Sequence, residues 1–269
     1  MHRRGTKLKY LTTYLIITAT LVAFDAPRTS VLRNDNGFID YANRVIVSRG
    51  TASVTAKETS QGDLQLVEKN LKLSKGEARA RARENLLDLV KLVNFDGRTV
   101  GEMMVSDPLT ESRVETLVGS AFQQGEIEYL ERKEVAIALA IKMSGLAEIL
   151  VDAGGYMNEN LAQSTFLMTR NATPKSERTS GIVIDARSIY HVPAMVPKIF
   201  NENDKLVYGP RHYTRSRSVN RGPMGYAHTM DDGNVRRRVG NNPILVEAVT
   251  SDDTCLLYTS DAADEGLGV

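Results

Sequence analysis

The sequence predicts an α+β protein: a small N-terminal domain, with a helix pair on a mostly antiparallel sheet, followed by a smaller β-rich domain. Three patterns predict this class. Residues 74–93 repeat apolar side chains at helical spacing, residues 127–143 alternate as the strands of a hairpin do, and the second half holds short strand-like pieces between turns. Helices that cover one face of an antiparallel sheet bury the apolar sides of both.

The N-terminal domain is predicted to span residues 38–153, after a linker at 27–37 that is rich in turn formers. Its first strand covers residues 45–56, which are β-branched and roughly alternating, and residues 57–73 are expected to form a loop. A helix then begins at Ser74, which forms a capping-box pattern with Glu77. The predicted buried stripe of this helix consists of Ala78, Ala82, Leu86, Leu89 and Val93, and its alanines predict close packing against a neighbouring element.

A turn and a short strand at 98–100 follow this helix. Ser106 or Asp107 is expected to cap the second helix, with Pro108 in its first turn. Its predicted buried face consists of Val114, Leu117, Val118, Ala121 and Phe122. Residues 127–143 predict a hairpin with a charged turn at 131–134, and Gly145 opens a short final helix.

A polar segment at 154–178 is predicted to link this domain to the β-rich domain at 179–250. The strands expected there are residues 181–186, 194–200, 206–208 and 244–249. Asp185 lies in the first of these strands, and we expect it to pair with Arg187 because a carboxylate in an apolar strand is usually paired.

The two ends of the chain have special signatures. Residues 1–26 predict a signal peptide, or an uncleaved signal anchor, because basic residues precede a short apolar run. We therefore expect a periplasmic protein. Residues 255–269 resemble a translated sequencing adapter, so the natural reading is expected to end near Thr254 and Cys255 to have no redox or metal role. No cysteine stands directly after the apolar run, so lipidation is not expected.

One basic cluster suggests a partner. The chain has 34 basic and 33 acidic residues, and this balance argues against a dedicated nucleic-acid binder. The candidate contacts for an anionic glycan or lipid are Arg211, Arg215, Arg217, Arg221, Arg236, Arg237 and Arg238. Tyrosines are interleaved with them. The alternative is that these arginines are scattered over a solvated surface.

Catalysis and metal binding are not predicted. The chain has four histidines, and no pair of them has the spacing of a zinc site. No nucleophile, base or glycine-rich phosphate loop stands in a suitable context, so neither an enzyme nor a cofactor is expected.

Several segments together resemble the LPP-twenty-type family of bacterial envelope lipoproteins, which includes relatives of flagellar outer-membrane components of the FlgP and FlgT type. They are GEARARARENLLDLVKLVNFDGRTV, YLERKEVAIALAIKMSGLAEIL, SGIVIDARSI, PAMVPKIFNENDKLVYG and RVGNNPILVEA. The resemblance implies a non-catalytic periplasmic protein associated with the outer membrane, which serves a flagellar or other surface apparatus. Its implied partners are envelope proteins, including further copies of itself. The sequence departs from the family in lacking a lipobox cysteine, and in having Asp204 where a turn glycine is expected.

The hypothesis that follows is a structural or assembly protein of the envelope. The alternative is a binding module for an anionic glycan or lipid through the basic cluster between Arg211 and Arg238.

Overall fold

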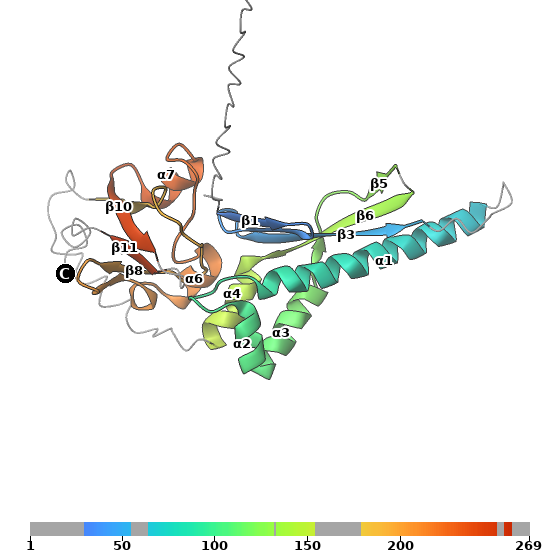
Figure 1. Cartoon of the computed structure of the whole chain (residues 1–269), viewed down its shortest axis with the longest axis horizontal. Helices are drawn as coiled ribbons and strands as arrows, with labels where there is room; N and C mark the ends of the chain where they lie inside the picture. The colour runs from blue at the N-terminus through green and yellow to red at the C-terminus, as the bar shows by residue number, and fades with distance from the viewer. Residues whose placement is uncertain (1–29, 55–63, 132, 154–178, 252–255, 260–269) are drawn as a thin grey trace, which may run out of the picture.

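The computed structural model describes residues 30–54, 64–131, 133–153, 179–251 and 256–259. They form an α+β protein, as predicted, with one sheet and its helices in the N-terminal half and a second, smaller sheet in the C-terminal half (Figure 1). The predicted signal segment and the predicted linker at 154–178 lie outside the described residues. A search of the described residues finds no helix long and apolar enough to cross a membrane.

The first sheet is antiparallel throughout. Its strands are β1 (Val31–Asn34), β2 (Gly37–Asp40), β3 (Val45–Ser53), β4 (Phe122–Gln123), β5 (Glu128–Leu130) and β6 (Glu134–Lys142), with the order β1-β2-β3-β6-β4 and β5 also paired with β6. The predicted hairpin at 127–143 is confirmed as β5 and β6. The predicted linker at 27–37 is wrong, because its turn-forming residues make the tight connection of the β1–β2 hairpin.

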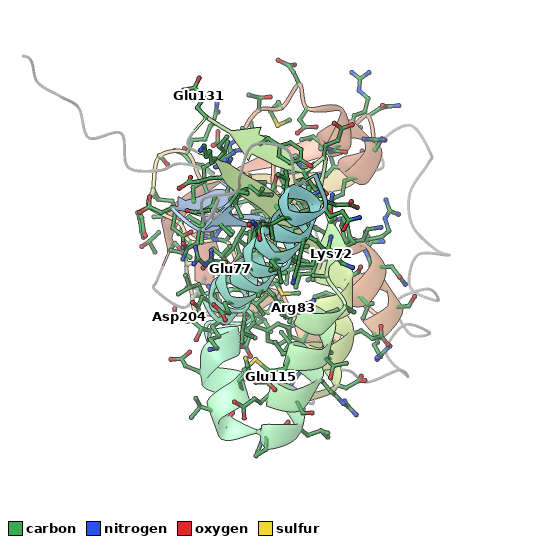
Figure 2. All side chains as sticks on the ribbon, turned by 90° about the vertical axis from the view of Figure 1, so that its right-hand side faces the viewer. Lys72, Glu77, Arg83, Glu115, Glu131 and Asp204 are labelled. Carbon is green, nitrogen blue, oxygen red and sulfur yellow. The ribbon has the colours of Figure 1, made fainter. Side chains whose placement is uncertain are left out.

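Helix α1 (Leu64–Lys91) runs along one face of this sheet (Figure 1). Its predicted stripe is buried from Ala78 to Val93, as expected. The helix begins at Leu64, so the loop predicted as far as residue 73 is wrong from there on, and so is the cap at Ser74. The Ser74 hydroxyl lies inside the helix and donates to the carbonyl of Asn70 in α1 and to that of Ser53 at the end of β3. The first turns escaped prediction because most of their apolar side chains, including Leu73, stay exposed and only Leu71 packs against the core. Charged side chains such as Glu77 and Arg83 also remain exposed along α1 (Figure 2).

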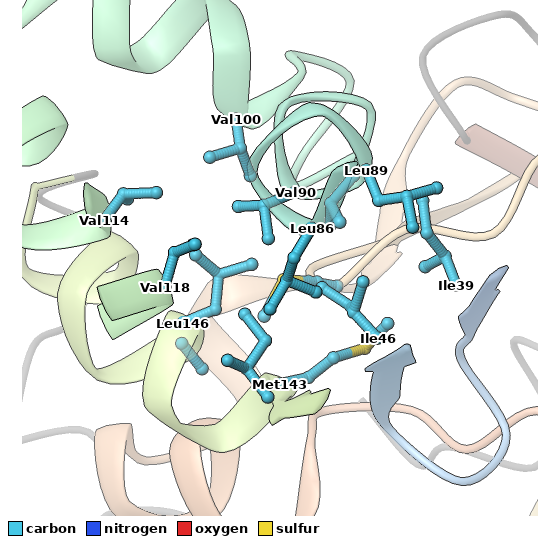
Figure 3. Close-up of a cluster of buried hydrophobic side chains, with 14 of the residues drawn as sticks. Ile39, Ile46, Leu86, Leu89, Val90, Val100, Val114, Val118, Met143 and Leu146 are labelled. Atoms are coloured by element: carbon cyan, nitrogen blue, oxygen red, sulfur yellow. The ribbon is translucent and has the colours of Figure 1, made fainter. Parts of the chain in front are cut away.

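Three further helices close the core. They are α2 (Val100–Ser106), α3 (Pro108–Gly119) and α4 (Met143–Ala153). Asp107 caps α3 as predicted, whereas the strand expected at 98–100 is reduced to one bridge, because Thr99 and Glu102 form a capping box that starts α2. Side chains from all four helices and from the sheet meet in one buried cluster (Figure 3). Phe122 was wrongly assigned to this core, since it lies exposed in the edge strand β4.

The second sheet is mixed, with the order β7-β10-β11-β8-β9. Its strands are β7 (Gly181–Asp185), β8 (Lys198–Asn201), β9 (Leu206–Tyr208), β10 (Pro243–Ser251) and β11 (Leu256–Thr259). The pairs β7–β10 and β8–β11 are parallel, and β8–β9 is the predicted hairpin. Its turn contains Asp204 with φ 58°, a left-handed conformation in which glycine would be unstrained. Strand β8 is shorter than predicted because Pro197 precedes it.

The prediction of a β-rich second domain omitted its helices. They are a 3₁₀ turn at Pro210–His212, α6 (Arg215–Arg221) and α7 (Gly233–Val239). Thr214 caps α6 and Asp232 caps α7, each accepting a hydrogen bond from a backbone N–H of the first turn. Both helices are seven residues long, which is too short to show an apolar stripe.

The two halves share a core and polar contacts. The backbone N–H groups of Met195 and Val196 donate to the carbonyls of Asn94 and Phe95, so the segment before β8 is tied to the first half. Arg215 of α6 forms ion pairs with Glu148 and Asp152 of α4, at 2.7 and 2.6 Å. These contacts hold α6 beside α4 and so fix one wall of the site described next.

Candidate anion-binding cleft

A cleft of about 1070 Å³ lies beside strand β7 and helices α6 and α7. Edge strand β7 lines it over its whole length, together with residues 186–191 that follow this strand. The first half contributes Tyr41, Ala42 and Arg44, and also Ser30. The Ser30 hydroxyl lies 3.2 Å from His228 Nε2 of the second half. The cleft is therefore built by segments far apart in the sequence.

The lining of the cleft is strongly basic. Six arginines face it: Arg44, Arg187, Arg217, Arg221, Arg237 and Arg238. Asp185 is the one carboxylate among the lining residues that the structure describes. The cleft therefore has an excess of positive charge, although the whole chain has a net charge of +1.

Arg238 is held in place by backbone carbonyls. Its Nη1 donates to the carbonyl of Arg221 at 2.9 Å, and its Nη2 donates to those of Gly222 and Pro223 at 2.6 and 2.8 Å. Burial lowers the pKa of Arg238, and repulsion by Arg217, Arg221 and Arg44 lowers that pKa further. Arg238 is thus close enough to each of these three arginines to be repelled by it.

Arg44 approaches the same place from the first half. Its Nη2 donates to the carbonyls of Ser218 and Val219 in the last turn of α6, at 3.4 and 3.0 Å. Cations are favoured at this end of a helix because its carbonyls have no partner within the helix. Burial lowers the pKa of Arg44. Neither Arg44 nor Arg238 has a carboxylate partner in the described part of the chain.

Arg217 and Arg221 are the available cations of the cleft. Both side chains are exposed, and within the described ranges neither guanidinium has a hydrogen bond or an ion pair. Arg237 is also exposed, with its Nη2 on the Asn234 side-chain oxygen at 2.5 Å. A guanidinium presents its donors in a planar fork that matches a phosphate or carboxylate. These side chains could therefore bind an anion without breaking an existing ion pair.

Asp185, Arg187 and His191, which also line the cleft, have partners within the protein. Asp185 pairs with Arg187 as predicted: its carboxylate accepts from the Arg187 Nε at 2.8 Å and from Nη2 at 2.5 Å. These bonds lower the pKa of Asp185 to about 2, so its charge is internally compensated at neutral pH. His191 stacks on Tyr226, and burial lowers the pKa of this histidine below its ordinary value. A neutral imidazole is expected at pH 7.

The structure divides the predicted arginine cluster. Arg217, Arg221, Arg237 and Arg238 line the cleft, whereas Arg211, Arg215 and Arg236 are outside its lining. Arg215 was predicted as a candidate contact with an anionic partner, but its guanidinium forms ion pairs with Glu148 and Asp152 of the first half. The sequence analysis missed Arg44, because only the fold brings it next to α6. Arg187 was predicted only as the partner of Asp185.

No group of three or more side chains suited to hold a metal ion occurs among the residues that the structure describes.

Residues 181–263 match a family model described as Treponema pallidum Tp0624, second domain. The match covers the second sheet, α6 and α7, and so includes most of the cleft but less than half of the chain. It also extends beyond Thr254, and Leu256–Thr259 forms β11 between β10 and β8. The predicted adapter origin of residues 255–269 concerns the nucleotide sequence and stays a prediction. No curated protein matches the chain.

Proposed function

We propose that this chain is a non-catalytic protein of the bacterial envelope that binds an anionic ligand in the arginine-lined cleft. The observation that carries the proposal is the convergence of Arg44, Arg217, Arg221 and Arg238, with no carboxylate partner for any of them among the described residues. Like charges held together raise the free energy of the empty site, and an anion relieves that repulsion. The apparent signal segment and the resemblance to envelope lipoproteins support a periplasmic setting.

Two pairs of arginine substitutions test the site. In Arg217→Gln/Arg221→Gln the two available guanidinium groups of the cleft are lost, and in Arg211→Gln/Arg236→Gln two exposed arginines outside it are lost. Both double variants lower the net charge by two, so they separate the cleft from general surface charge. Inorganic pyrophosphate is a suitable probe, because guanidinium groups bind phosphate oxygens in a bidentate manner.

We expect pyrophosphate affinity, measured by calorimetry at low salt, to fall at least about 10-fold in the cleft variant, since hydrogen bonds to charged groups contribute about 1.5–3 kcal/mol. The control variant should stay within about 2-fold of the parent protein. Equal losses in both variants would refute a specific cleft. Affinity should also decrease as salt is added, because salt screens charge pairing at exposed sites.

A structural or assembly role, beside a flagellar or other surface apparatus, is the second candidate. The first turns of α1 extend past the sheet and expose Leu66, Val67 and Leu73, with fractional exposures of 36, 52 and 64% (Figure 1). Leu66 and Leu73 are seven residues apart and therefore share one face of the helix, and adjoining exposed apolar side chains favour a protein interface. If further copies of the chain cover them, Val67→Glu/Leu73→Glu should reduce the sedimentation coefficient of the protein to that of a monomer. A parent protein that is already monomeric at high concentration would count against self-assembly.

A further inference from the structure

The arginines occupy only part of the cleft, and much of the remaining lining is apolar. Tyr190, Met230 and Leu245 all line it, and they are 66, 49 and 60% exposed. Scattered exposed apolar side chains are ordinary, but several within one concave site indicate a surface that is covered in the functional state.

Strand β7 supports the same conclusion. Its Ile182, Val183 and Ile184 are only half-buried, although β7 pairs with β10 in parallel. Parallel strands are normally covered on both faces, which is why they consist of continuous apolar residues. Among the described residues no strand pairs with the other edge of β7. The apolar sequence of β7 therefore fits a strand against which an apolar group packs.

The positive charge of the cleft indicates that the ligand which packs against β7 also has an anionic part. An apolar protein segment alone would leave the guanidinium groups of Arg217 and Arg221 without partners, and a free phosphate would leave Leu245 and β7 uncovered. A volume of about 1070 Å³ is at the upper end for small-molecule sites, and far larger than one phosphate needs. A ligand with an anionic head and an apolar body satisfies both parts of the lining.

We infer that the cleft binds an anionic amphiphile, a lipid whose phosphate is held by Arg217 and Arg221 while its acyl part packs against β7 and Leu245. This inference rests on the proposed anion-binding function and names its ligand class. The lipid is recognised as a single molecule in a concave site, so a soluble short-chain lipid binds without a membrane.

The test compares three soluble probes by calorimetry on the full chain. Dihexanoyl phosphatidylglycerol, below its micelle concentration, has both the phosphate and the chains, glycerol 3-phosphate has the phosphate alone, and dihexanoylglycerol has the chains without a phosphate. We expect the first to bind at least about 10-fold more tightly than glycerol 3-phosphate, since each buried methylene strengthens binding about 4-fold. It should also bind at least about 10-fold more tightly than dihexanoylglycerol, since hydrogen bonds between guanidinium and phosphate are charge-assisted.

Strand β10 provides a matched pair of variants. Leu245 lines the cleft, whereas Val249 lies four residues further along the same strand, is 57% exposed and is outside the lining. Burial alternates along β10 from Leu245 to Val249, with Val246 and Ala248 buried between them, so the two point to the same face. Leu245→Asn should weaken dihexanoyl phosphatidylglycerol binding at least 3-fold and leave glycerol 3-phosphate binding unchanged, and Val249→Asn should affect neither. Unchanged melting temperatures would show that both variants are folded.

The outcomes separate the two proposals. Equal affinity for glycerol 3-phosphate and the anionic lipid, lost in Arg217→Gln/Arg221→Gln, would refute the amphiphile and keep the anion site. Equal affinity for dihexanoylglycerol and the anionic lipid would refute the role of charge, and with it the proposed function. If the protein bound neither pyrophosphate nor any of the three probes, both proposals would be refuted.

Discussion

Replacing Gly50 of β3 with alanine tests the contact between α1 and the first sheet. A Cβ at this position would lie 2.2 Å from the backbone nitrogen of Ala82 and 2.3 Å from the carbonyl oxygen of Ala78. Ordinary contacts begin near 3.4 Å, so α1 must move away by about 1 Å. Neither obstacle is a flexible side chain, because both atoms belong to the helix backbone.

The cost can be assembled from three contributions. Overpacking costs about 1–3 kcal/mol. The hydrogen bond from the Ser48 hydroxyl to the carbonyl of Ala82, now 2.6 Å, would be stretched beyond bonding distance, at about 1 kcal/mol. Removing a strand glycine returns about 0.5–1 kcal/mol of conformational entropy. The free energy of unfolding of Gly50→Ala should therefore fall by about 2 kcal/mol.

Urea denaturation followed by circular dichroism measures this change. Gly76 is the control, because it lies within α1 and a Cβ there meets nothing within 4 Å. Gly76→Ala should raise the stability by about 0.5–1 kcal/mol through helix propensity alone. If Gly50→Ala were neutral or stabilising as well, α1 would not pack on β3 at the distance described, and the reasoning would be refuted.

Three further predictions concern single sites. Thr99→Ala removes the cap of α2 and should lower the free energy of unfolding by about 1 kcal/mol in the same urea assay. Leu86→Ala, at a fully buried position, should lower it by about 2–5 kcal/mol; a loss below 1 kcal/mol would contradict the burial. The Asp185 carboxyl should titrate by NMR at a pKa of about 2, and nearer its ordinary 3.8 in Arg187→Gln. Because the folded-state pKa is depressed, the stability from this pair is complete above about pH 4 and lost as the pH falls towards 2.

Sequence patterns predicted the elements that bury one regular face. The stripe from Ala78 to Val93 repeats at helical spacing. Its first two alanines lie against Gly50 of β3, where the helix and strand backbones approach closely. The β5–β6 hairpin also followed directly from alternation. In both cases the information is local, because the side-chain period alone specifies the element.

Elements without a buried face were missed. The first turns of α1 expose Leu66, Val67 and Leu73, so no stripe marks them as helical. The caps of α6 and α7 are present in the sequence as Thr214 and Asp232, but seven arginine-rich residues after each cap look like a solvated loop. A cap without a following apolar period is a weak signal.

The cleft could be predicted only in part, since the sequence shows where the arginines are in the chain but not which residues lie next to them in space. Arg215 and Arg217 are two residues apart, yet α6 turns the first towards Asp152 and leaves the second beside the cleft. Arg44 is distant in the sequence and reaches Val219 only through the tertiary fold. Which arginine is compensated and which is available is thus decided by contacts between the two halves.

The overall charge of the chain says little about this site. Basic and acidic residues number 34 and 33, which argued against a dedicated nucleic-acid binder, whereas the cleft lining contains six arginines and one aspartate. Charges separated by more than about 10 Å are largely screened at 0.1 M salt, so carboxylates beyond that distance do not neutralise the guanidinium groups of the cleft. A neutral protein can therefore present a locally positive site, and an anion is attracted to that site without the nonspecific binding that a basic surface would produce.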